Sequence, residues 1–280
     1  MLAVPNVSEG RDTAALDAIG AAFARGGARV LDVHADPDHH RAVFTLAGDP
    51  GVLSAALAEG AREVVARIDL DQDRGLHPHV GALDVAPVVH LDDACRGAAV
   101  AEALVLGDRL GAELGLAVFL YGALAGGRTR AQLRAGGRAG LTQRGTPPDF
   151  GPRALHPSAG ATLVTARPPL VAFNLELAAP AGLAEARAIA AALRESGDEG
   201  QPGLRAIGLT LAARDGVAQV SCNVEDHRAL PLARLLAAVE RHAPVAEAEL
   251  VGLAPQAAFD GWPDRVAIRN RATVEERLSH

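Results

Sequence analysis

The chain of 280 residues is 49% hydrophobic, which is enough to bury a sizeable core and allows one large domain or two ordinary ones. Its formal net charge of −7 argues against a nucleic-acid-binding protein held by phosphate contacts. All 27 basic residues are arginine, which excludes Schiff-base lysine chemistry and the lysine of a phosphate-binding loop.

The N-terminus has neither the basic region nor the long apolar stretch of a signal peptide, and charges and glycines interrupt every apolar run that could cross a bilayer. Cys95 and Cys222 stand far apart without metal-type spacing, which favours small buried residues in a reducing compartment over a disulfide. We therefore expect a soluble, cytoplasmic protein with no membrane or nucleic-acid partner. We also expect a homodimer.

Apolar periodicity in the first third of the chain predicts strands and helices in the order β-α-β-β-α-β. The predicted elements are a strand at 2–7, a helix at 13–27, strands at 28–33 and 41–48, a helix at 50–68 and a strand at 83–91. This order is the split βαβ pattern of ferredoxin-like layers. A helix at 92–113, a strand at 116–122 and a long Gly/Arg/Pro-rich connection to about residue 160 follow; such a connection is either a binding loop or a plain linker.

The same order of elements returns in the second half of the chain. The predicted elements are a strand at 169–177, a helix at 182–197, strands at 204–213 and 216–224, a helix at 230–243 and a strand at 247–254. An Arg-Asp-Gly turn joins the two central strands as a hairpin. We therefore predict an α/β (α+β) fold of two ferredoxin-like subdomains, 1–168 and 169–280.

Six of the ten histidines lie before residue 91, and their density raises the question of a metal site. His34, His39, His40, His77 and His79, with Asp36 and Asp38, are chemically suitable ligands for zinc or manganese. No set of them closes at tetrahedral spacing, so surface histidines in polar loops are favoured and no metal is expected.

The other interpretation of this region is proton transfer. Pro78 restricts His77 to an extended backbone, and Gly75 and Gly81 allow the main chain to approach a ligand closely. A neutral imidazole takes a proton from an attacking amine and returns it to a leaving one.

Six motifs occur together in one order: "VPNVSEGRD", "GLHPHVGALDVAPVV", "FLYG", "PDFGP", "HPSAGAT" and "VAFNLEL". In this set the chain resembles the formiminotransferase domain of glutamate formimidoyltransferases, the folate enzymes of histidine breakdown, over nearly its whole length. The resemblance implies two α/β subdomains, in agreement with the repeated order of elements. It also implies transfer of a formimino group from N-formimino-L-glutamate to N5 of tetrahydrofolate as co-substrate, without a metal.

Site residues follow from the same resemblance. His77 takes the place of the family's catalytic acid/base. The folate-contacting loop falls on Gly151, Pro152, Arg153, Ala154, Leu155, His156, Pro157, Ser158, Ala159 and Gly160. Arg41 and Arg153 are suited to pair with the carboxylates of glutamate or folate. His34, His40 and His79 complete the predicted substrate-binding set.

Four positions differ from the family pattern: Leu76 stands for a glutamate, His79 for an arginine, His34 for an aspartate and Ala159 for a tryptophan. They leave open an enzyme that cyclises 5-formyltetrahydrofolate, or a formyl or formimino transferase with another donor, such as a related amino acid. A metal-dependent hydrolase and a non-catalytic folate or small-acid binder are the alternatives of other classes. We expect a stand-alone form without the fused cyclodeaminase domain of animal enzymes, so that a separate deaminase acts on the product.

Overall fold

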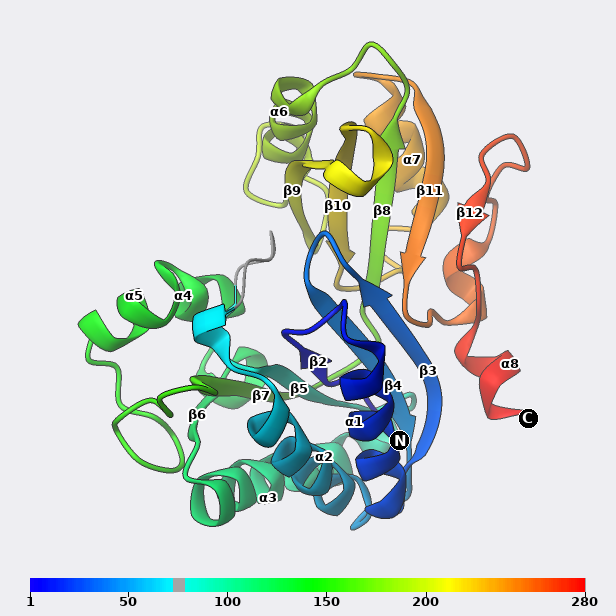
Figure 1. Cartoon of the computed structure of the whole chain (residues 1–280). Coiled ribbons are helices and arrows are strands. Elements are labelled where there is room, and N and C mark those ends of the chain that lie inside the picture. Colours follow the sequence, from blue (N-terminus) through cyan, green and yellow to red (C-terminus); the bar gives the residue numbers. More distant parts are fainter. Residues whose placement is uncertain (73–78, 280) are drawn as a thin grey trace. The chain divides into compact units, whose positions relative to one another are not determined.

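The computed structural model describes residues 1–72 and 79–279, and the chain divides into two compact units, residues 1–168 and 169–280. The elements are labelled in Figure 1. Each unit carries its own hydrophobic core, in which helices cover a sheet. The mixed α/β class with two sheets that the sequence predicts is confirmed.

The first unit begins with the predicted β-α-β-β-α-β order. Its elements are β1 (Leu2–Ala3), β2 (Asn6–Val7), α1 (Thr13–Arg25), β3 (Arg29–Asp36), β4 (Arg41–Ala47), α2 (Leu53–Arg67), β5 (Leu83–Val89), α3 (Arg96–Leu114), β6 (Ala117–Leu120), α4 (Arg130–Arg134), α5 (Gly137–Gln143) and β7 (Ala161–Arg167). The predicted first strand is split at Pro5, which has no N–H to donate to a ladder. The predicted polar loop before β4 is shorter than expected, because β3 extends to Asp36.

The sheet of this unit is a ferredoxin-like core with an added parallel edge. β1 and β2 both pair between β4 and β5, antiparallel to each, and β3 pairs with the far side of β4. β7 then pairs parallel with β5, and β6 pairs parallel with β7. The sequence did not indicate this extension, because parallel pairing depends on contacts remote along the chain.

Helices α1, α2 and α3 pack side by side and close the core of the first unit (Figure 1). Helix α1 is capped by Asp12, whose carboxylate accepts the Ala15 N–H at 3.0 Å. Phe23 on α1 meets Phe44 on β4 edge to face, with ring centroids 5.3 Å apart.

The connection predicted as irregular from about 124 to 160 contains two short helices, α4 and α5. Helix α4 starts with a capping box, in which the side chains of Thr129 and Gln132 each accept the other's backbone N–H. This Thr-x-x-Gln spacing is the sequence signal that would have predicted the helix.

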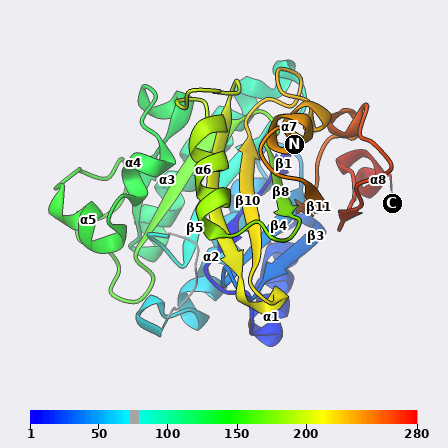
Figure 2. The same ribbon diagram turned by 90° about the horizontal axis from the view of Figure 1, so that it is seen from above.

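The second unit repeats the order in a five-stranded sheet. Its elements are β8 (Val171–Leu177), α6 (Leu183–Leu193), β9 (Leu204–Leu211), β10 (Val217–Val224), α7 (Leu232–Glu240), β11 (Val245–Val251), β12 (Ile268–Arg269) and α8 (Val274–Leu278). The strand order is β12-β11-β8-β10-β9, antiparallel except for the β11–β12 pair. Helices α6 and α7 contact each other and pack on this sheet (Figures 1 and 2).

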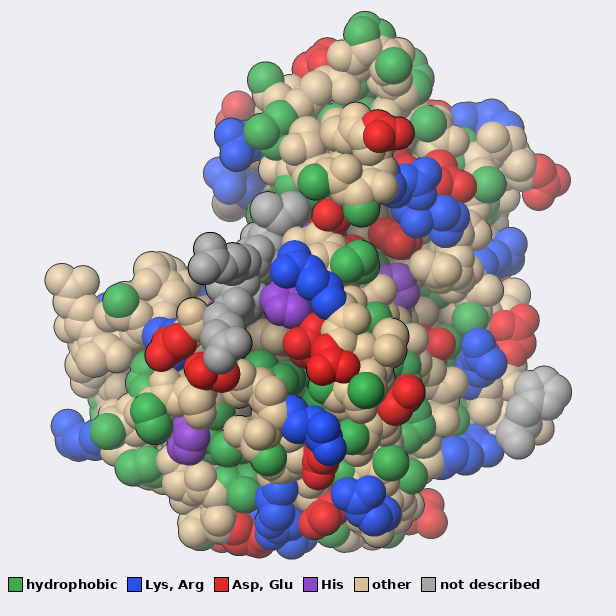
Figure 3. All heavy atoms as spheres, in the orientation of Figure 1, with side chains coloured by type: hydrophobic (Ala, Val, Ile, Leu, Met, Phe, Trp, Pro, Cys, Tyr) green, Lys and Arg blue, Asp and Glu red, His purple; other side chains and the backbone are tan. Residues whose placement is uncertain are grey.

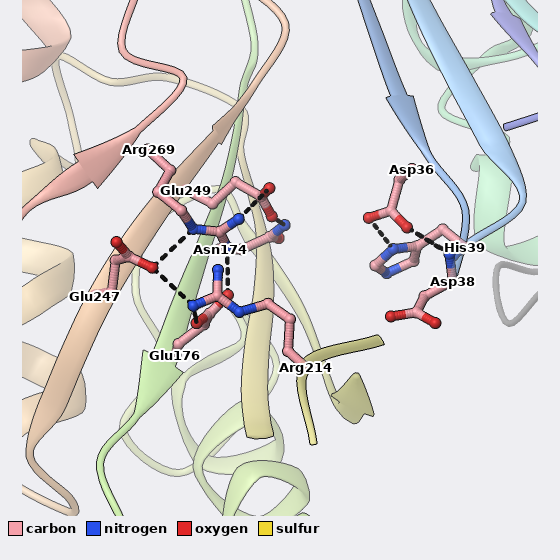
Figure 4. Close-up of polar contacts among 9 residues, drawn as sticks. All are labelled: Asp36, Asp38, His39, Asn174, Glu176, Arg214, Glu247, Glu249 and Arg269. Atoms are coloured by element: carbon pink, nitrogen blue, oxygen red, sulfur yellow. Dashed lines mark hydrogen bonds and ion pairs between the residues drawn. The ribbon is translucent and has the colours of Figure 1, made fainter. Parts of the chain in front are cut away.

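Strand β8 shows how this sheet divides its faces. Phe173 and Leu175 point into the core with the helices, while Asn174 and Glu176 alternate with them on the opposite side. Asn174 donates from its side chain to Glu249 at 3.0 Å, so this buried polar group has a partner. Figure 4 shows the resulting cluster, in which Glu176 is paired with Arg214 and Arg269.

Two sequence expectations concern surface and solvent. Cys222 is buried as expected, but Cys95 is exposed, because it precedes α3 on a short surface turn. On the face drawn in Figure 3, acidic and basic side chains are interspersed and do not form one patch. Among the helices of residues 1–72 and 79–279, none has the length and apolar character needed to cross a bilayer.

Candidate functional site

The candidate site lies at one edge of the sheet in the first unit. Val7, at the end of β2, is the register partner of both Ala42 in β4 and Leu83 in β5. The starts of β6 and β7 lie in register at Ala117 and Ala161. The loops that follow β2 and precede β4, β5 and β7 therefore meet at one edge.

Asp84 is the buried centre of this edge. Its side chain is fully buried, and one carboxylate oxygen accepts the Val80 N–H at 2.9 Å. The other accepts from Nη1 of Arg41 at 2.8 Å, and Arg41 also donates from Nε to the Asn6 side chain at 3.0 Å. Burial lowers the pKa of Arg41 to about 10, although Asp84 opposes that shift.

Helix α4 carries two more arginines at this site, of which Arg134 reaches the same carboxylate. Arg134 donates from Nη2 to Asp84 and is nearly buried. Arg130, one turn earlier, lies over the ring of Tyr121 with its guanidinium carbon 5.7 Å from the ring centroid. The positive charges of both arginines add to the lowering of the Arg41 pKa, so the three guanidinium groups lie close enough to repel.

Hydrogen bonds hold the loop after β2 to neighbouring segments of the chain. Ser8 is buried and donates from Oγ to the Gly81 carbonyl at 2.8 Å. Glu9 accepts the backbone N–H groups of the next three residues, which shapes the turn into α1. The Nδ1 atom of His40 lies 3.2 Å from the Gly10 nitrogen and 3.3 Å from a Glu9 carboxylate oxygen.

The turn between β3 and β4 is ordered by Asp36 (Figure 4). One of its oxygens accepts the N–H groups of Asp38 and His39, and the other lies 2.6 Å from Nδ1 of His39. Burial acts to raise the pKa of Asp36, but the bonds from His39 outweigh it and the pKa is lowered. His34 is half-buried two residues before this turn, on β3.

The histidine-rich turn does not assemble a metal site within the part of the chain that the structure describes. No three His, Cys, Asp or Glu side chains converge there at metal-binding geometry. Asp36 and His39 are engaged with each other, which accounts for two of the proposed ligands by a local structural role.

A surface depression of about 500 Å³ borders α4, and its polar groups are used within the fold. Of its two arginines, Arg128 pairs with Asp149, and Arg144 donates to the carbonyls of Leu133 and Ala135. This depression therefore offers fewer available donors than the edge around Asp84.

Comparison with known families decides what the chain is. The model of the formiminotransferase domain, N-terminal subdomain, matches residues 1–167, and that of the formiminotransferase domain matches residues 172–262. The chain belongs to the formiminotransferase family.

Named relatives fall into two groups by length. The chain is 35% identical to a glutamate formimidoyltransferase of Streptococcus pyogenes and 34% identical to one of Thermoplasma acidophilum, over 91% of this chain and 89% or 88% of theirs. It is 37% identical to the formimidoyltransferase-cyclodeaminase of Sus scrofa over 90% of this chain, and spans about half (49%) of that protein.

The loop predicted to contact folate, residues 151–160, forms backbone hydrogen bonds to the chain on both sides of residues 73–78. On one side, the Leu70 N–H donates to the Ser158 carbonyl at 3.0 Å. On the other, the Ala82 N–H donates to the Ala159 carbonyl at 2.9 Å, and the Ala161 N–H donates to the Val80 carbonyl at 2.9 Å. The structure thus brings this loop beside the described residues that precede and follow 73–78.

The members of this loop differ in accessibility. Gly151, Pro152, Arg153 and Ala154 are exposed, as is Pro157, whereas Leu155, His156 and Ser158 are half-buried. Ala159 and Gly160 are buried and contribute backbone groups more than side chains. A Cβ atom at Gly160, where φ is +68°, would lie 2.2 Å from the Val80 carbonyl oxygen.

His156 has a defined local geometry in the loop. Its Nδ1 accepts the Ala159 N–H at 3.0 Å, so the ring presents its proton at Nε2 when neutral. Within the described residues Arg153 makes no ion pair, which leaves its charge available to a ligand.

His77, the predicted acid/base, lies outside the described residues, and His79, the first described residue after 73–78, is half-buried. Sequence reasoning missed Asp84, Arg130 and Arg134. Asp84 carried a signal, because a single carboxylate inside the apolar run at 83–89 is rarely buried without a partner. The two α4 arginines carried none, since only the fold brings Arg134 to Asp84 and Arg130 near Arg41.

Proposed function

We propose that this chain transfers a formimino group from N-formimino-L-glutamate to N5 of tetrahydrofolate, with His77 as general acid/base. The observation that carries the proposal is the match to two glutamate formimidoyltransferases along nearly the whole of each. The geometry of the first unit supports it, because the predicted folate loop is bonded to both flanks of the segment that contains His77.

The proposed reaction forms one carbon–nitrogen bond and breaks another. N5 of tetrahydrofolate attacks the formimino carbon of the donor, and His77 accepts the proton that N5 loses. The tetrahedral species then expels glutamate as the carbon–nitrogen bond of the donor breaks, and the same histidine returns the proton to the leaving nitrogen. The loop 151–160 and the half-buried His34, His40 and His79, with Arg41, are assigned to hold the substrates.

The broader setting is part of the same proposal. We infer a cytoplasmic enzyme of histidine degradation that acts as a homodimer, as the sequence and the family resemblance lead us to expect. Tetrahydrofolate is a co-substrate, and no metal takes part in the proposed steps.

A direct assay tests the transferase assignment. The purified protein is incubated with N-formimino-L-glutamate with and without tetrahydrofolate, and released glutamate is measured. We expect release only when both substrates are present. Release without folate would point to a hydrolase, and conversion of 5-formyltetrahydrofolate without a donor amino acid would point to a cyclising enzyme.

A further inference from the structure

We propose that Arg41 and Arg134, which both donate to Asp84, form a carboxylate-binding subsite of the enzyme together with Arg130, one helical turn before Arg134. This inference rests on the proposed function, and it adds a ligand class and two residues to it. The carboxylate comes from either the amino-acid donor or the glutamyl tail of folate, since both present the same chemistry to a guanidinium group.

The positive charges of this group outnumber its negative charge. The guanidinium groups of Arg41 and Arg134 share the single carboxylate of Asp84, which leaves one positive charge in excess, and the charge of Arg130 also acts on Arg41. Arg41 is 8% exposed, and like charges held together at such burial are unfavourable without an anion. A bound carboxylate would offset that repulsion.

Two guanidinium donors at Asp84 find no acceptor among the described residues. Arg41 commits Nε to Asn6 and Nη1 to Asp84, and its Nη2 has no partner among the described residues. The Nε of Arg134 is buried and likewise finds no acceptor there. A buried donor left without an acceptor is unfavourable, so the buried Nε of Arg134 beside Asp84 indicates an acceptor supplied from outside the fold.

The arginines of this group are held in position before a ligand arrives. Asn6 and Asp84 fix the plane of the Arg41 guanidinium from two directions. Tyr121, which is 6% exposed, supports Arg130 from below, and its hydroxyl has no partner in the part of the chain that the structure describes. A preorganised fork of this kind suits two-point recognition of a carboxylate.

Arg130→Gln is the most informative variant, because Arg130 makes no described ion pair whose loss would disturb folding. We expect the KM of one substrate to rise roughly tenfold to a hundredfold with little change in kcat. Arg130→Lys keeps the charge but loses the fork, and we expect a smaller rise. Arg62→Gln, which removes a charge paired with Glu59 and Glu113, serves as the matched control.

The substrate whose KM rises identifies the source of the carboxylate: the donor, or the tail of tetrahydrofolate. Either result supports the subsite. Arg134→Gln provides a second test if its circular dichroism matches that of the wild type. Values of KM within twofold of wild type for both substrates, in Arg130→Gln and in folded Arg134→Gln, would overturn the proposal.

Direct binding separates this inference from the transferase assignment. Titration calorimetry with N-formyl-L-glutamate and with 5-formyltetrahydrofolate needs no turnover. If the wild type binds either ligand and Arg130→Gln weakens it, the subsite stands even where no transfer is detected. If transfer occurs and neither affinity changes, the proposed function stands and the subsite falls.

Discussion

The two units share one order of strands and helices but organise their buried charges in opposite ways. In the first, Arg41 and Arg134 share the single carboxylate of Asp84, and the charge of Arg130 also acts on Arg41, so that arginines are in excess. In the second, the carboxylates of Glu176, Glu247 and Glu249 each lie within 3.3 Å of an arginine, Arg214 or Arg269. A common backbone therefore supports one cluster suited to an anionic ligand and another whose charges pair with each other.

The second cluster shows what satisfied pairing does to a buried acid. Burial raises the pKa of Glu176, although Arg269 and Arg214 act to lower it. The charged form of Glu176 is therefore disfavoured by the fold despite two ion pairs, as expected for buried pairs whose desolvation exceeds their attraction. Charge clusters in the two units thus have different consequences for stability.

The largest expected effect concerns the two histidines around Pro78. We predict that His77→Ala lowers turnover by roughly a hundred- to ten-thousandfold, because it removes the group that moves the proton. Substrate affinity should change little, since proton transfer matters mainly in the transition state. His79→Ala should instead alter affinity or donor preference. Equal, mild losses of turnover in both folded variants would mean that neither histidine carries the proton transfer.

The free energy of unfolding distinguishes the two clusters. Asp84→Asn leaves two buried arginines without their anion, and we expect a loss of about 3–5 kcal/mol in the free energy of unfolding. Glu176→Gln should stay within about 1 kcal/mol of wild type at pH 7, because Arg214 and Arg269 keep Glu247. Urea unfolding measures both; comparable losses would mean that the clusters do not differ.

The pH dependence of Glu176 follows from the direction of its pKa. The folded state binds the proton at a higher pH than the unfolded state, so protonation favours folding. The wild type should gain stability relative to Glu176→Gln as the pH falls from the raised pKa toward the ordinary value of 4.5. A relative loss over that window would show that the ion pairs outweigh burial.

A backbone test of the loop has a smaller expected effect. Gly160 and Gly145 both have positive φ, +68° and +63°, but only Gly160 would place a Cβ against the Val80 carbonyl. We predict that Gly160→Ala destabilises by about 1–3 kcal/mol more than Gly145→Ala, and weakens folate binding. Equal melting temperatures and equal folate affinities for the two variants would contradict this role of the loop.

The smallest expected effect is that of a chelator. We predict that dialysis against a chelator leaves turnover unchanged, because Asp36 and His39 engage each other and the proposed steps use no metal. Elemental analysis that finds about one zinc or manganese per chain, with activity lost on its removal, would favour the hydrolase.

The repeated order of elements was predictable because apolar periodicity and turn residues are local signals. The Arg-Asp-Gly turn between β9 and β10 is one example, and Asp215 in it has a φ of +52°. The parallel strand β7 and the approach of Arg134 to Asp84 were not predictable, because contacts between remote segments create them. The assignment of His77 came from resemblance and stays a prediction.

The central claim is group transfer, and an isotope label tests it most directly. N-formimino-L-glutamate labelled with ¹³C at the formimino carbon is incubated with tetrahydrofolate and the wild-type protein, and the products are followed by mass spectrometry. The account predicts that the label appears on the folate in equal amount to the glutamate released. Release of glutamate with the label in free formamide or formate, and none on the folate, would contradict it.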